Sequence, residues 1–192
     1  MRNRSGWGAM LLVLALTAAA TSAVGAARVL APETYTATAT VKTAGGATVT
    51  APVTITITRW TTDAERTKAF AALKQGEAAL KAALESMPAA GTIQLGGRTT
   101  PLHFARTLPT GGGKLVNLVA TQPIVYLGAG VPEHKPKAGY GFAFATFEVG
   151  ADGKGTTGDL APAAKLKLGT GDALVVDDYG VDVVRLTAIS SK

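Results

Sequence analysis

The stretch Thr62–Met87, TDAERTKAFAALKQGEAALKAALESM, is the part of the chain around which we expect the fold to be organised. Its first residues, Thr62 and Glu65, have the spacing of a capping box, in which each side chain satisfies the other residue's backbone N–H. Large apolar residues then recur at the spacing of one helix face, which predicts a single long amphipathic helix packed on a sheet. These residues are Phe70, Leu73, Leu80, Leu84 and Met87.

Two residues inside this stretch bear on that prediction. Gly76 weakens a helix by about 1 kcal/mol relative to alanine, so a kink or two shorter helices are the alternative. Glu77 is the one acidic residue within the apolar side. Because a buried carboxylate needs a partner, a buried Glu77 without Lys or Arg beside it would indicate a cavity, whereas an exposed Glu77 would indicate a purely architectural helix.

The chain on either side of the helix alternates between polar and apolar residues. From Thr34 to Val41 threonine occupies every second position, and the segment 48–60 repeats this pattern with Val53, Ile55 and Ile57 on one face. Such alternation predicts strands with one buried face, and the short Gly- and Pro-rich connections favour antiparallel neighbours. We therefore expect an α+β fold: a predominantly antiparallel β-sheet, or a partly open barrel or sandwich, with a single long amphipathic helix inserted after the second strand.

The segment 140–149 is the most aromatic strand. Tyr140, Phe142 and Phe144 share one face, whereas Phe147 and Val149 belong to the opposite face. Large apolar residues on both faces predict either a β-bulge or a strand that is buried on both sides.

The N-terminus has the three parts of a secretory signal peptide. Arg2 and Arg4 precede an apolar run over residues 10–16, and small residues end at Ala26 and Ala27. This arrangement predicts cleavage after Ala26 or Ala27, with Ala23 as an alternative. We expect residues 1–27 to be the leader and residues 28–192 to form one β-rich α+β domain, exported to the periplasm or the extracellular space without a stable membrane span.

Composition and motifs argue against several functional classes. Removal of Arg2 and Arg4 with the leader lowers the formal charge from +6 to +4, and the sequence has no basic run, so we expect no nucleic-acid binding. The chain contains no cysteine, which excludes disulfides and thiol chemistry. The segment Gly111–Lys114 resembles a phosphate loop, but Leu115 stands where Ser or Thr would hold magnesium, and a strand follows.

No catalytic, metal or cofactor site is predicted. His103 and His134 are the only histidines, and they lack the spacing of a zinc motif. A hydrolase without local motifs would need two facing carboxylates, for which the candidates are Glu133, Glu148, Asp177 and Asp178. The sequence places no two of them together, so we expect a protein that is not an enzyme.

The leading hypothesis is an exported, non-enzymatic binding module for a small apolar ligand or for an envelope or extracellular protein. Its site would lie between helix and sheet, with a contribution from the long loop after residue 128. The candidate ligand-binding residues are Phe70, Leu73, His134, Tyr140, Phe142 and Phe144. The alternatives are a purely structural or interaction domain of the cell envelope, which would use a sheet edge or the threonine face, and the hydrolase.

Overall fold

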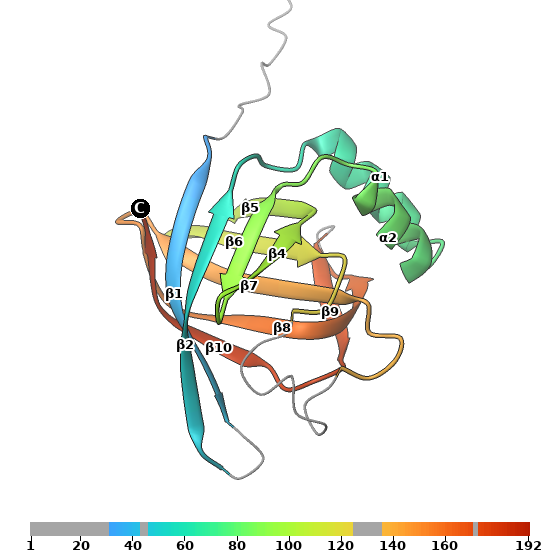
Figure 1. Ribbon diagram of the computed structural model, residues 1–192. Helices are drawn as coiled ribbons and strands as arrows, with labels where there is room; N and C mark the ends of the chain where they lie inside the picture. Colours follow the sequence, from blue (N-terminus) through green and yellow to red (C-terminus); the bar gives the residue numbers. More distant parts are fainter. Residues whose placement is uncertain (1–30, 43–45, 125–135, 171–172) are drawn as a thin grey trace, which may run out of the picture.

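The computed structural model describes residues 31–42, 46–124, 136–170 and 173–192 (Figure 1). The predicted leader, residues 1–27, lies outside these ranges, and so does His134. Neither of the two helices in the described ranges is long and apolar enough to cross a membrane.

The described residues form one sheet of ten strands in which all paired neighbours are antiparallel, as the sequence predicts. The order across the sheet is β4-β3-β2-β1-β10-β8-β7-β6-β5, and β9 pairs with β8 outside this path. The strands are β1 (Glu33–Lys42), β2 (Thr48–Ile57), β3 (Gly91–Leu95), β4 (Arg98–Leu102), β5 (Phe104–Pro109), β6 (Gly113–Ala120), β7 (Phe142–Gly150), β8 (Lys154–Leu168), β9 (Leu174–Tyr179) and β10 (Val184–Ser191).

The first and last strands of this order, β4 and β5, follow each other directly in the chain. The sheet therefore curves into a nearly closed barrel (Figure 1). β4 pairs with β3 and β5 pairs with β6, while only His103 separates β4 from β5. The N–H of His103 donates to the carbonyl of Val119 in β6 (2.9 Å). Its ring lies 3.3 Å from the Thr121 hydroxyl, and burial lowers the pKa of the imidazole. His103 therefore occupies the corner at which the barrel closes.

β8 is a long strand of 15 residues that pairs with two later strands, β9 and β10. The first half of β8 pairs with β10, and its second half pairs with β9. Pro162 and Ala163 of β8 lie opposite the single residue Ala143 of β7, which is a β-bulge. Because a bulge bends its strand, the second half of β8 leaves the barrel wall and carries β9 over the outer surface.

The prediction of a single long helix is wrong. The segment forms two short helices, α1 (Asp63–Leu73) and α2 (Glu77–Glu85), which pack against each other outside the barrel (Figure 1). Gly76 has a φ of +123°, a conformation that side chains with a Cβ rarely adopt, and it becomes the N-cap of α2. The capping box at Thr62 and Glu65 is confirmed. A hydrogen bond from Arg59 is the main cause of a lowered pKa at Glu65.

The barrel lumen is filled by a first core that we call the lumen core. The alternating apolar residues of β1 and β2 point into it, as predicted. Tyr35 of β1 and Phe147 of β7 meet inside it, edge to face, with ring centroids 5.1 Å apart. These two strands are not neighbours in the sheet, so the contact spans the lumen.

A second core, the outer core, lies between the outside of the barrel wall and the two helices. The buried members from the helical segment are Ala69, Phe70, Leu80, Leu84 and Met87, and those from the sheet are Phe104, Val119, Phe142, Phe144, Ala161, Ala164, Leu166 and Leu174. Phe142 and Phe144 therefore face outwards, while Phe147 and Val149 face the lumen. The aromatic strand is buried on both sides, which is one of the two alternatives that its sequence predicts.

Candidate functional site

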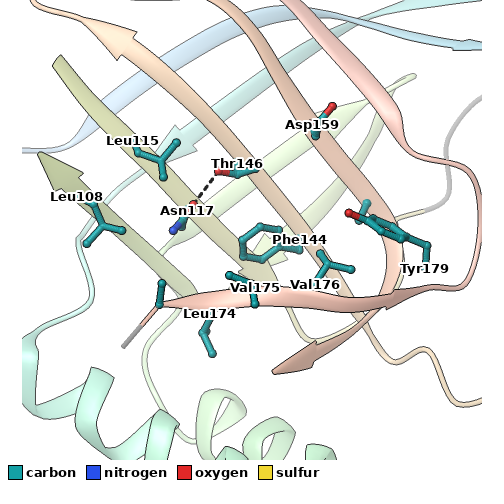
Figure 2. Close-up of a pocket in the computed structure, with 12 residues that line it drawn as sticks. Leu108, Leu115, Asn117, Phe144, Thr146, Asp159, Leu174, Val175, Val176 and Tyr179 are labelled. Carbon is teal, nitrogen blue, oxygen red and sulfur yellow. Dashed lines mark hydrogen bonds between the residues drawn. The ribbon is translucent and has the colours of Figure 1, made fainter. Parts of the chain in front are cut away.

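The best candidate site is a groove on the outside of the barrel beneath β9, which we call the outer groove. Figure 2 shows β9 crossing the strands of the barrel wall. The space between them has a volume of about 310 Å³. It is bounded by residues of five strands and of the turn before β9: Leu108, Leu115, Asn117, Phe144, Thr146, Asp159, Ala161, Ala173, Leu174, Val175, Val176 and Tyr179.

The floor of the outer groove contains a polar row formed by Asn117, Thr146 and Asp159. The strand register places Asn117 of β6 opposite Thr146 of β7, and Thr146 opposite Asp159 of β8. Residues in such opposed positions have their Cβ atoms about 5 Å apart and share one face of the sheet. The row thus follows from register alone, because the three positions have the parity that points away from the lumen.

Apolar rows lie on both sides of the polar row. Leu108 of β5 faces Leu115 of β6 on one side, and Phe144 of β7 faces Ala161 of β8 on the other. β9 covers these rows with Leu174, Val175 and Val176. A mostly apolar concave surface with a few polar groups in its floor is typical of sites for small molecules.

Hydrogen bonding within the polar row is incomplete. The Thr146 hydroxyl donates to Oδ1 of Asn117 (2.8 Å), and the Asn117 nitrogen points away from Thr146 (Figure 2). Asn117 is only 7% exposed, and its Nδ2 has no hydrogen bond within the described part of the chain. At the other end, Asp159 Oδ1 lies 3.0 Å from Nη1 of Arg185, its cross-strand neighbour in β10.

Four of the predicted site residues come together, but chiefly as packed core. Phe70, Phe142 and Phe144 are buried in the outer core, and Leu73 packs against it partly exposed. Because these side chains contact one another, they fill the space between helices and sheet where the sequence predicts the site. Phe144 alone of the four also lines the outer groove.

Tyr140 lies in a second, shallower hollow of about 270 Å³ that it shares with Glu77, Lys81 and Phe142. Its hydroxyl donates to Asp178, and this hydrogen bond is the main cause of a raised pKa at Tyr140 and a lowered pKa at Asp178. Lys165 lies over its ring, 5.0 Å from the centroid. Tyr140 thus contacts charged neighbours and does not line the outer groove.

Glu77 is neither buried without a partner nor exposed, the two cases expected from the sequence. It is half-buried, and its carboxylate accepts a hydrogen bond from the backbone N–H of Leu166 in β8 (3.0 Å). The pairing of β7 with β8 ends at Ala164, two residues before this N–H. Glu77 therefore fastens α2 to the bent half of β8, and it supports the wall from which β9 extends.

The carboxylates considered for hydrolysis are held by separate partners. Glu148 accepts from the Thr110 hydroxyl (2.6 Å), Asp177 pairs with Lys167 (2.9 Å), and Asp178 accepts from Tyr140. Glu133 lies outside the described residues. Within the described ranges, no three His, Asp or Glu side chains are grouped closely enough to hold a metal ion.

The residues of the polar row were missed by sequence reasoning, although one of them carries a recognisable pattern. Asn117 is the single amide in the apolar run Leu115–Ala120, and such an interruption in a buried strand marks a polar group that needs a partner. Thr146 and Asp159 have no comparable pattern, because their proximity to Asn117 depends on strand pairing.

Comparisons with protein-family models, with curated proteins and with solved structures give no match to this chain.

Proposed function

We propose that this protein is an exported, non-enzymatic binding module that holds a small, mostly apolar molecule in the outer groove. The observation that carries the proposal is the groove itself: apolar rows from four strands of the barrel wall, covered by β9, with Asn117 in the floor, whose Nδ2 has no hydrogen bond to the described residues. The lumen core and the outer core are occupied by large side chains, so the groove is the better place for a guest molecule.

The position of β9 supports this proposal. β9 pairs with only one strand, β8, and lies off the path of the barrel. Its residues Leu174 and Val176 belong to or pack on the outer core and also line the groove, together with Val175 and the exposed Tyr179. A molecule that fills about this volume with apolar contacts is expected to bind with a Kd in the range of about 1–100 μM.

The test uses N-phenylnaphthylamine, a neutral apolar fluorophore, with the protein lacking its leader. Binding in the groove is expected to raise the emission of the fluorophore and shift it to the blue. Leu115→Arg places a cation among the apolar rows, and we expect it to weaken binding about tenfold or more, because the charge must be desolvated when the ligand enters. Fluorescence titration measures the effect.

Val183→Arg is the matched control, because Val183 is 37% exposed and does not line the groove. The control variant is expected to bind the fluorophore as the wild type does. If the wild type gives no saturable signal, or if both arginine variants bind equally well, the outer groove is not the site.

The exported location is the second part of the proposal and rests on the leader-like residues 1–27. We expect the full chain, expressed in a bacterium, to be recovered outside the cytoplasm with a new N-terminus after Ala26 or Ala27. N-terminal sequencing of the recovered protein identifies the cleavage site. Replacement of Leu12 and Leu14 by lysine interrupts the apolar run and should keep the uncleaved chain in the cytoplasm. Retention of wild-type protein with Met1 intact would contradict export.

A further inference from the structure

We infer that the ligand of the outer groove carries a neutral carbonyl group, flanked by apolar parts on both sides, whose oxygen accepts a hydrogen bond from the Asn117 amide. This inference rests on the proposed function and specifies the chemistry of its ligand. It combines the Nδ2 donor of Asn117, the charges around the polar row and the apolar rows on either side.

Asn117 determines the kind of group that is recognised. Its Oδ1 already accepts from Thr146, so Nδ2 offers N–H donors to the groove. The side chain is more than nine-tenths buried. Nδ2 is not one of the fully buried polar atoms without a partner, so this donor remains accessible from the groove. A ligand that covers the groove removes the donor from water, and a ligand oxygen that accepts from it replaces the lost hydrogen bond. An apolar ligand without an acceptor would bury Nδ2 without a partner, which costs free energy.

Charges around the polar row favour a neutral acceptor over a carboxylate. Asp159 is the one charged side chain among the described lining residues, and Glu148 follows Thr146 two positions along β7 on the same face. Arg185 is paired with Asp159 (3.0 Å). Arg106, the cross-strand neighbour of Asn117, is engaged by Asp63 (2.7 Å) and by the Thr61 carbonyl (3.1 Å). An anionic ligand would thus meet two acids, whereas the two arginines at the ends of the row, Arg106 and Arg185, are already paired with carboxylates.

The rows of the floor determine where the carbonyl lies within the ligand. Asn117 lies between the row of Leu108 and Leu115 and the row of Phe144 and Ala161. A molecule that contacts both apolar rows passes over the amide with its middle part. The arrangement therefore suits a ketone or an ester, in which the carbonyl lies between two carbon-containing parts of the molecule, better than a terminal acid.

The test compares three ligands of similar shape, each measured by displacement of N-phenylnaphthylamine. Acetylnaphthalene has the carbonyl, isopropenylnaphthalene replaces its oxygen by a methylene group, and naphthoate replaces its methyl group by a charged oxygen. We expect the wild type to bind the ketone about tenfold more tightly than the alkene, the range of one recovered hydrogen bond. Naphthoate is expected to bind more weakly than the ketone.

Asn117→Leu keeps the approximate volume and removes the donor. The variant should bind the ketone and the alkene with equal affinity, and continued binding of N-phenylnaphthylamine shows that it is folded. Gln94→Leu makes the same kind of change at an exposed position of β3 and should keep the preference for the ketone. Infrared spectroscopy gives a direct readout: the C=O stretch of the bound ketone should lie at lower frequency in the wild type than in Asn117→Leu.

The outcomes separate this inference from the proposed function. If the wild type binds N-phenylnaphthylamine but does not distinguish ketone from alkene, the role of Asn117 is refuted and the groove remains a binding site. Tighter binding of naphthoate than of the ketone refutes the neutral ligand. If N-phenylnaphthylamine does not bind at all, the proposed function itself fails.

Discussion

Replacement of Phe147 by alanine is expected to lower the free energy of unfolding by about 3–5 kcal/mol, the usual cost of emptying a buried phenylalanine site. Phe147 is only 2% exposed and meets Tyr35 edge to face inside the barrel. Because β7 and β1 are not neighbours in the sheet, the lost contact joins opposite walls and no backbone hydrogen bond replaces it. Chemical denaturation followed by circular dichroism measures the change.

Two variants control for the cause of this loss. Phe147→Leu keeps most of the apolar volume and is expected to cost clearly less than Phe147→Ala. Tyr35→Phe keeps the ring contact but removes the Tyr35 hydroxyl, which donates to Glu33 and whose pKa is raised mainly by burial. Were Phe147→Ala to cost less than about 1 kcal/mol, the lumen would not be packed as described, and the lumen would become a competing ligand site.

Gly91→Ala is expected to destabilise the protein by about 3 kcal/mol or more, or to prevent its folding. Gly91 is the first residue of β3, and a Cβ built there overlaps the carbonyl oxygen of Thr56 and lies 2.9 Å from the Cα of Ile57. Both contacts are backbone atoms of β2 and cannot move aside by a rotamer change. The substitution must therefore separate β3 from β2, whose pairing includes Ile57 with Gly91. Thermal unfolding and soluble yield measure the effect.

Gly97→Ala provides the matched control for Gly91→Ala. Gly97 lies in the turn between β3 and β4 and has a φ of +78°, and a Cβ at this position would meet no atom within 4 Å. Its substitution introduces backbone strain without a clash, which costs about 1–2 kcal/mol. Equal losses at the two positions would mean that strain, rather than the close approach of β3 to β2, explains the effect.

The two-core organisation explains why the outer groove lies on the outside of the barrel. The lumen is filled by the inward residues of the barrel strands, and the helices cover one part of the outer wall. Beside the helices, the same wall is covered by β9, and space is left between β9 and the wall. The barrel thus acts as a rigid floor, and the extended hairpin acts as the cover.

The sequence predicted the strands best where one face is buried and the other is wet. The alternation in residues 34–41 and 48–57 matches β1 and β2, with Val53, Ile55 and Ile57 buried. It also predicted the capping box at Thr62 and the apolar side of the helical segment. These features depend on residues close together in the chain, whose periodicity is a local property.

The predicted site residues stay a prediction, and the structure shows the phenylalanines among them packed in a core. Phe70, Phe142 and Phe144 do gather between helices and sheet, but their volumes fill that space. Whether apolar side chains enclose a cavity or close-pack depends on how the elements carrying them are spaced, and no periodicity reports that distance. The one helix became two for a related reason, since Gly76 permits a break but only the docking of both halves on a curved wall determines that the break occurs.

The sequence by itself determined the β-rich class, the antiparallel pairing, the helical segment after the second strand and the absence of disulfides, because each follows from composition or from local periodicity. Only the tertiary structure decided the barrel closure at His103, the second core and the bent hairpin that carries β9. It also decided the polar row, since Asn117, Thr146 and Asp159 are brought together by the register of three strands. Register depends on backbone hydrogen bonds between residues far apart in the chain, and these form only when the whole sheet is assembled.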